Sequence, residues 1–263
     1  MKTYLTLSAI ALAAAATLSS GTVLAQAAAP AATPDFVVTG NFGITSDYRF
    51  RGISQNDLDP AFQGGFDVAH SSGLYIGTWG SNVSTWTAGT GSFEMDFYGG
   101  YKTTVGDLGV DVGVIAYKYP GTTASGRSET EEMYLGFTYG PAVFKTSYVL
   151  GKDYFASAGS DNSGTMYYDL TLAKEIMPKL TASVHAGYTD YKKDGESAVG
   201  GKFSYADYNV GLTYDLGNGF TTSAKYFWND EKAGTKSYAG TTGSGTGKNL
   251  LKDGFAVSLT KTF

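Results

Sequence analysis

The chain has 263 residues, no cysteine and a net charge of −5. The lack of cysteine excludes a disulfide framework and thiolate chemistry, and an acidic chain without a basic surface does not predict binding to nucleic acid. Glycine (36 residues) and tyrosine (20 residues) are abundant, which is unlike the composition of an α/β enzyme. We found no motif for a cofactor, a metal ion or a catalytic site, so the sequence predicts none of these.

The N-terminus has the pattern of an export signal. Lys2 precedes an apolar stretch from Leu5 to Leu18, and small residues follow it. We therefore expect residues 1–25 to be a cleaved signal peptide, and the apolar stretch is short for the alternative, an uncleaved membrane anchor. An Ala/Pro-rich segment, 26–35, predicts a flexible lead-in, and 36–263 is expected to form the folded domain.

The clearest strand runs from Phe36 to Gly52. Apolar residues such as Phe42 and Ile44 alternate with polar residues such as Asp47 and Arg49. Successive side chains of a strand point to opposite faces, so this segment has one apolar and one polar face. A soluble core does not need so long a strand of this kind, whereas the wall of a membrane barrel does.

The same alternation recurs along the chain. Beyond the predicted signal peptide, no apolar run approaches the roughly 20 residues of a membrane-spanning helix, so a membrane location requires a closed barrel. The sequence therefore predicts an all-β fold, a transmembrane antiparallel up-and-down barrel of twelve strands. The strands are predicted at 36–52, 60–70, 74–84, 93–103, 108–119, 132–139, 142–150, 166–174, 180–191, 203–215, 220–230 and 254–263.

The connections alternate between short and long, which is what an even-stranded barrel requires when both termini lie in the periplasm. The last segment alternates cleanly and stops on Phe263, like the signal read by the bacterial barrel-insertion machinery. We therefore expect export through the periplasm, insertion by that machinery and residence among the lipids of the bacterial outer membrane.

The polar faces predict the lining of the lumen. Eight acidic and five basic residues point inward, a net charge of −3, and such a lining predicts a weak preference for cations. The alternative is that these charges pair across strands and fill the barrel. The predicted inward charges are Asp47, Arg49, Arg51, Asp67, Glu94, Asp96, Lys102, Asp111, Glu132, Lys145, Asp169, Asp207 and Lys225.

The cluster of Asp47, Arg49 and Arg51 is the best candidate for a constriction or a binding element. Its alternative role is a salt-bridge ladder with acidic residues on neighbouring strands, namely Asp67, Glu94 or Asp96.

Aromatic residues fall on both faces. Outward rings fit the girdles at the two membrane interfaces. Inward Tyr75, Trp79 and Tyr98 fill the lumen or, as a minority alternative, form a track for sugars. The predicted girdle residues are Tyr48, Phe50, Tyr101, Tyr139, Tyr188, Tyr214 and Trp228.

Several segments in the N-terminal half also resemble a known family. Ser46–Gln55 (SDYRFRGISQ), Gln63–Asp67 (QGGFD), Gly77–Val83 (GTWGSNV) and Glu94–Tyr101 (EMDFYGGY) are similar to the TorF-type porin family of proteobacteria. The likeness is densest over residues 38–103. It implies an outer-membrane barrel and says little about the solute.

Together these patterns predict a passive porin for small hydrophilic solutes, with no preference indicated between monomer and oligomer. One alternative is a non-conducting structural or adhesive barrel that acts through its loops, of which 231–252 is the longest. A third alternative, an outer-membrane phospholipase, needs a Ser–His pair on the lipid-facing wall. His185 is predicted to face the lumen and His70 to lie beside a short turn. Neither histidine has a nucleophile at a spacing that indicates a catalytic pair.

Overall fold

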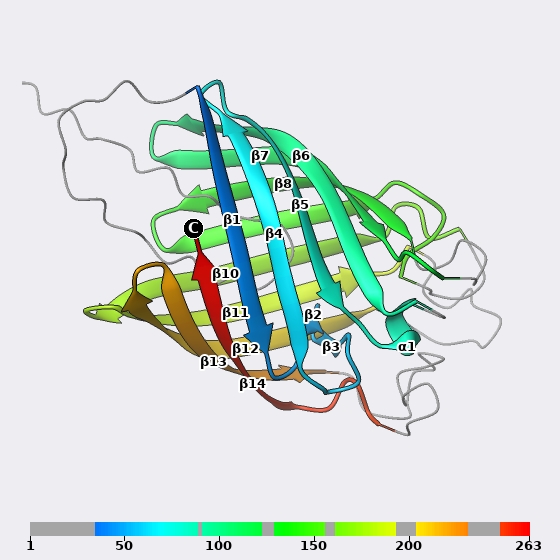
Figure 1. Ribbon diagram of the computed structural model, residues 1–263. Coiled ribbons are helices and arrows are strands. Elements are labelled where there is room, and N and C mark those ends of the chain that lie inside the picture. The colour runs from blue at the N-terminus through cyan, green and yellow to red at the C-terminus, as the bar shows by residue number, and fades with distance from the viewer. Residues whose placement is uncertain (1–34, 89–90, 123–128, 156–160, 193–203, 231–247) are drawn as a thin grey trace, which may run out of the picture.

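The computed structural model describes residues 35–88, 91–122, 129–155, 161–192, 204–230 and 248–263, so the predicted signal peptide lies outside the described residues. Twelve antiparallel strands close into one barrel (Figure 1). They are β1 (Phe36–Thr45), β4 (Ala61–His70), β5 (Leu74–Asn82), β6 (Phe93–Val105), β7 (Leu108–Lys118), β8 (Thr130–Tyr139), β9 (Ala142–Val149), β10 (Met166–Met177), β11 (Leu180–Asp190), β12 (Tyr205–Gly217), β13 (Phe220–Asn229) and β14 (Gly254–Thr262). The predicted twelve-stranded barrel is confirmed.

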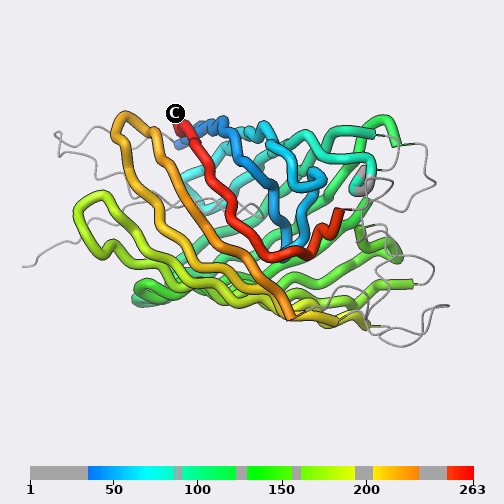
Figure 2. Tube along the Cα trace, turned by 90° about the horizontal axis from the view of Figure 1, so that it is seen from below, coloured from blue at the N-terminus to red at the C-terminus, as the bar shows by residue number. Residues whose placement is uncertain are grey.

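The five short turns all lie at one end of the barrel, on the left of Figures 1 and 2, and we call this the turn end. Asn218 and Gly219 join β12 to β13 with positive φ angles of 52° and 76°. Two consecutive residues with positive φ form a tight turn whose twist matches that of the two strands it connects. The strand ends that the longer connections join lie at the opposite end, which we call the loop end.

The outer face of the barrel is apolar on every strand. Each wall strand exposes at least one large apolar side chain, because the strand pleat sends alternate residues outward. A belt of this size would cause aggregation in water and matches the lipid-facing surface of a membrane barrel. One exposed member from each strand in chain order is Phe42, Phe66, Ile76, Phe97, Val114, Met133, Phe144, Leu170, Val184, Val210, Phe220 and Phe255.

Most of the predicted girdle aromatics lie on this outer face. Tyr101, Tyr139, Tyr188 and Tyr214 are exposed. Trp228 stacks on the ring of Tyr208 at 5.5 Å and on that of Tyr226 at 6.0 Å. Tyr48 and Phe50 do not belong to this set, for the reason given below.

The barrel closes where the last strand meets the first. The amide of Gly40 donates to the carbonyl of Phe263 at 2.8 Å, and the amide of Phe263 donates to the carbonyl of Gly40 at 2.9 Å. Gly40 leaves room for the terminal ring, because a Cβ there would lie 2.6 Å from a Phe263 ring carbon. The ring also packs against Phe66, with ring centroids 6.2 Å apart.

The prediction that the first strand continues to Gly52 was wrong. β1 ends at Thr45, and the chain then folds into the barrel as a small hairpin of β2 (Arg49–Phe50) and β3 (Ile53–Ser54). Arg51 and Gly52 form its turn with positive φ angles of 47° and 78°, which a wall strand cannot contain. We call residues 46–55 the lumen hairpin. A short helix, α1 (Thr85–Ala88), follows β5.

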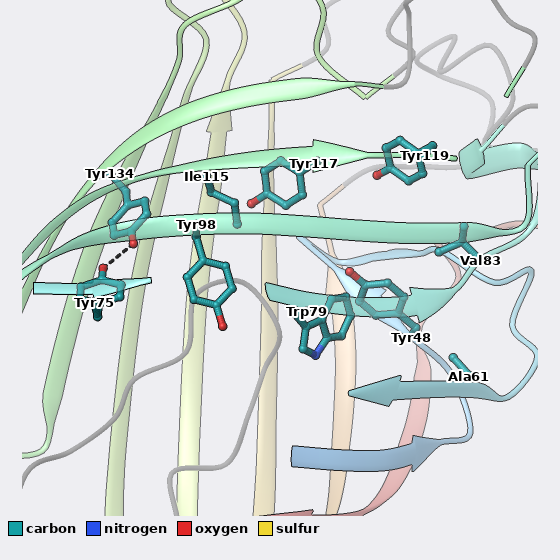
Figure 3. Close-up of a cluster of buried hydrophobic side chains, with 10 residues drawn as sticks. All are labelled: Tyr48, Ala61, Tyr75, Trp79, Val83, Tyr98, Ile115, Tyr117, Tyr119 and Tyr134. Atoms are coloured by element: carbon teal, nitrogen blue, oxygen red, sulfur yellow. Dashed lines mark hydrogen bonds between the residues drawn. The ribbon is translucent and has the colours of Figure 1, made fainter. Parts of the chain in front are cut away.

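This bend also corrects two predicted side-chain directions. Tyr48 and Phe50 were expected to face lipid, but Tyr48 is buried against Trp79, with ring centroids 5.5 Å apart, as Figure 3 shows. Phe50 packs against Tyr117 at 5.7 Å. The alternation of apolar and polar residues in the sequence therefore continues past Thr45, where the strand itself ends.

No helix among the described residues is long and apolar enough to cross a membrane.

Candidate pore lumen

The predicted inward charges outside the lumen hairpin lie on wall strands and on the face opposite the apolar belt. Each is flanked along its strand by outward residues, since the pleat alternates. Their role in a pore stays a prediction. They are Asp67 on β4, Glu94, Asp96 and Lys102 on β6, Asp111 on β7, Glu132 on β8, Lys145 on β9, Asp169 on β10, Asp207 on β12 and Lys225 on β13.

Toward the turn end, tyrosines and carboxylates are linked along the wall from β4 to β8. The hydroxyl of Tyr98 donates to Asp67 at 2.7 Å, and that of Tyr75 donates to Asp111 at 2.6 Å. Tyr75 also hydrogen-bonds Tyr134 at 2.5 Å, the dashed line of Figure 3. These hydroxyls are occupied by wall contacts, which favours a wall-filling role for these rings over a sugar track.

Charged side chains in this part of the lumen reach water. Lys102 and Asp111 lie 3.8 Å apart, with side chains 30% and 23% exposed. The Lys102 ammonium also lies 4.4 Å from the centre of the Tyr75 ring, and Lys145 lies 4.1 Å from that of Tyr134. The turn-end half of the lumen therefore contains partly exposed charges of both signs.

On the opposite wall, His185 lies between two carboxylates. Its Nε2 is 3.2 Å from Asp207, and its Nδ1 is 3.4 Å from Asp169. Thr171 and the Tyr167 hydroxyl complete the surroundings of the ring at 3.1 Å and 3.3 Å. The prediction placed His185 in the lumen but did not identify this cluster, because its members come from β10, β11 and β12.

Two of the three predicted constriction residues hold the lumen hairpin together. The Arg49 Nε lies 2.5 Å from an Asp47 carboxylate oxygen, and the other Asp47 oxygen accepts from Ser54 at 2.6 Å. Arg49 also donates to the carbonyls of Gly52 and Leu250, both at 3.2 Å. These contacts fix the shape of the hairpin and tie it to the segment that precedes β14.

The third residue, Arg51, crosses the lumen. Its guanidinium makes a two-point contact with Glu132 on β8, at 2.8 Å and 2.7 Å, and donates to the Tyr154 hydroxyl at 2.7 Å. It also lies 4.4 Å from the centre of the Tyr167 ring on β10. The predicted ladder with Asp67, Glu94 or Asp96 was wrong, because the hairpin carries Arg51 away from β4 and β6 to the far wall.

At the level of the lumen hairpin, inward side chains of the wall are buried. Every wall strand contributes an inward side chain that is at most 7% exposed, and we call this set the buried ring. Several members touch the hairpin directly, among them Trp79, Tyr117 and Glu132. In chain order the buried ring is Thr45, Ala61, Trp79, Asp96, Tyr117, Glu132, Val149, Tyr167, Thr189, Asp207, Phe227 and Ala256.

One carboxylate of the buried ring lacks a partner. Both oxygens of Asp96 are buried without a hydrogen bond, and the same holds for the indole nitrogen of Trp79, its register partner on β5. Glu94, by contrast, accepts from the hydroxyls of Tyr48 at 3.0 Å and Tyr119 at 3.1 Å. A buried carboxylate without a partner destabilises the packing around it.

The residues that hold the hairpin tip were missed from sequence. Tyr205 donates through its hydroxyl to the Arg51 carbonyl at 2.7 Å, and Tyr154 and Leu250 pack around the returning strand. One signal was present, since Gly52 inside an apparent strand indicates a bend or a close approach of backbones. A Cβ at Gly52 would lie 2.6 Å from the Asp207 Cβ.

A close Ser–His pair among the described residues has a structural explanation. The Nδ1 of His70 is 2.7 Å from the Ser72 hydroxyl and also accepts from the Ser72 amide at 3.1 Å, so the ring caps the turn between β4 and β5. Across the described residues, no group of three or more His, Asp or Glu side chains is arranged to hold a metal ion.

Comparison with solved structures identifies the fold. The KdgM porin in complex with disordered oligogalacturonate superposes with a TM-score of 0.51 at 6% identity, over 86% of this chain and 99% of that one. The NanC porin superposes with a TM-score of 0.52 at 11% identity, over 86% and 98% of the two chains. At such identities these likenesses show the fold alone, which is that of outer-membrane porins.

A search of curated proteins found no relative of the chain. A family model matches residues 28–263, nearly the whole chain. The protein therefore belongs to the Gcw_chp family, which is described as bacterial proteins of unknown function.

Proposed function

We propose that the protein is a passive porin of the bacterial outer membrane that admits small hydrophilic solutes. The observation that carries this proposal is the contrast between the two faces of the barrel, an apolar belt outside and a charged, partly solvated wall inside. A barrel that only anchored its loops would have no use for solvated charges in its interior. The resemblance to TorF-type porins supports the same function.

The route to the membrane follows from the two ends of the chain. Residues 1–25 direct export and are removed, and 26–35 leave a short lead-in before the barrel domain at 36–263. Phe263 serves as the insertion signal for the barrel-insertion machinery. Phe263 is 64% exposed and its ring packs next to Phe66, where another protein can reach it before the barrel meets lipid.

The lumen sets the class of solute. Twelve strands about 4.8 Å apart, tilted by about 40°, give a backbone cylinder of roughly 12 Å radius, which inward side chains narrow further. The charges that we assign to the lumen sum to −3, and they give the pore a weak preference for cations. A polyanion such as the oligogalacturonate of the KdgM complex is disfavoured by this lining.

Planar-bilayer recordings on refolded protein test the proposal. We expect discrete conductance steps and, in a salt gradient, a reversal potential of the sign for cation preference. Addition of sugars, amino acids and small acids then identifies the solutes that block the current. The proposal would be contradicted if correctly folded barrels were silent both with the lumen hairpin and after its removal.

One observation favours a second candidate function. Every wall strand has a buried inward side chain at the level of the hairpin, as expected for a non-conducting structural or adhesive barrel that acts through its extracellular loops. Recordings of the parent protein and of a variant without the lumen hairpin distinguish the two functions.

A further inference from the structure

The lumen hairpin is not part of the barrel's sheet. Its own ladder has two residue pairs, Arg49 with Ser54 and Phe50 with Ile53, and it forms a sheet separate from the barrel. The twelve wall strands pair with one another and close without it. If the Ser46 amide stays bonded to the Val257 carbonyl of β14, residues 47–54 can leave the lumen with the pairing of the wall strands intact, at the cost of the hydrogen bond from the Ser54 amide to the Leu250 carbonyl.

The far end of the hairpin is held by polar contacts. The Arg51 guanidinium pairs with Glu132, and the Tyr205 hydroxyl donates to the Arg51 carbonyl. When these groups separate into a water-filled lumen, hydration offsets most of the electrostatic attraction that they lose. The reason is that a buried ion pair is little more stable than its two partners when each is hydrated. The polar contacts at the tip therefore contribute little to the difference in free energy between the seated and withdrawn positions.

Two features of the seated position are unfavourable. The carboxylate of Asp96 is buried without a partner beneath the hairpin, and water would reach it if the hairpin withdrew. In the segment that returns from the hairpin to β4, Asp57 and Leu58 have positive φ angles of 55° and 62°. A bulky residue such as Leu58 is strained in this conformation, and movement of the segment would relieve the strain.

From these observations we propose that the lumen hairpin is a gate. In the seated position it completes the buried ring and closes the pore, and in the withdrawn position it opens a water-filled passage. The contact between Arg51 and Glu132 is the latch that holds the closed position. This inference rests on the proposed porin function and adds its regulation.

A reversible crosslink tests the gate. The Ser54 amide donates to the Leu250 carbonyl at 3.0 Å, so the two backbones are close enough for a disulfide between Ser54→Cys and Leu250→Cys. The chain has no cysteine of its own, so the pair can form no competing bond. In planar bilayers, we expect the oxidised variant to show at least a tenfold lower open probability than the same molecules after reduction, and each single-cysteine variant to be insensitive to reduction.

A second variant shows what the open pore does. Replacement of residues 47–54 by two glycines removes the hairpin and leaves the wall strands intact, and its folding is checked by heat-dependent migration on gels. We expect it to stay open. If it conducts, and the oxidised and reduced cysteine variants conduct equally, the gate is wrong and the porin function stands. If the folded, shortened barrel is silent, the porin function itself is wrong.

Discussion

The barrel wall and the lumen hairpin are held by different kinds of contact. Along the wall, β6 and β7 pair residue by residue from Met95 with Lys118 to Val105 with Leu108, close together in the chain. The hairpin instead depends on residues far away in sequence, since Arg49 reaches Leu250 across 201 positions and Arg51 reaches Tyr205 across 154. Repetitive backbone pairing makes the wall robust, whereas a few side chains decide where the hairpin sits.

The largest expected effect comes from removing the Arg51 side chain. Arg51→Ala leaves the Glu132 carboxylate buried at the hairpin without its cation, a loss of about 3–5 kcal/mol for a buried pair. We expect the hairpin to leave its seat while the wall stays folded. Hydrogen exchange at the Ser54 amide should then accelerate at least about 100-fold, with wall amides unchanged.

Arg51→Lys is the matched control for this prediction. It keeps the charge but loses the two-point contact, so we expect an intermediate acceleration. Equal exchange at Ser54 in the parent chain and in Arg51→Ala would show that Arg51 does not hold the hairpin.

The next effect concerns the wall. Val184 faces outward and is 48% exposed, whereas its neighbour Ser183 faces the lumen. We expect Val184→Arg to lower the free energy of unfolding by about 2–4 kcal/mol, because an arginine near the bilayer midplane is costly. Ser183→Arg should change it by less than about 1 kcal/mol. Urea unfolding in lipid vesicles measures both, and equal losses would contradict the assigned faces.

This difference between the two regions explains what could be predicted from sequence. Eleven of the twelve strands were predicted with ends within three residues of those observed, because a two-residue period and short Gly- or Asn-containing turns are local signals. The exception is β1, where the alternation runs on past Thr45 into the hairpin. Alternation reports which residues are apolar, and it does not report where the backbone leaves the sheet.

The lumen could be predicted only in part for the same reason. Asp67, Lys102 and Asp111 lie on the predicted inner face, since face follows from the pleat. The partner of Arg51 could not be predicted, because it depends on a turn at Arg51 and Gly52 that carries the guanidinium across the barrel to Glu132. No local pattern encodes a contact between opposite walls.

A smaller effect is expected from Asp96→Asn. Neutralising a buried carboxylate that lacks a partner removes an unfavourable charge from beneath the seated hairpin, which should stabilise it by about 1 kcal/mol. Exchange at the Ser54 amide should slow several-fold. Asp111→Asn is the control, because its carboxylate accepts from Tyr75 and lies toward the turn end, and it should leave Ser54 unaffected. Faster exchange in Asp96→Asn would mean that the charge itself helps to seat the hairpin.

The smallest effect is expected at the base of the hairpin, where an ion pair is exposed to water. Lys248 lies 3.1 Å from Asp59, with side chains 38% and 63% exposed. Exposed pairs contribute about 0–1 kcal/mol, since water and salt screen them. Lys248 also donates to the Asp57 carbonyl at 2.7 Å. Lys248→Ala should therefore raise exchange at Ser54 less than about fivefold, and added salt should reduce that difference. An effect as large as that of Arg51→Ala would show that the hairpin is held at its exposed base rather than at its buried tip.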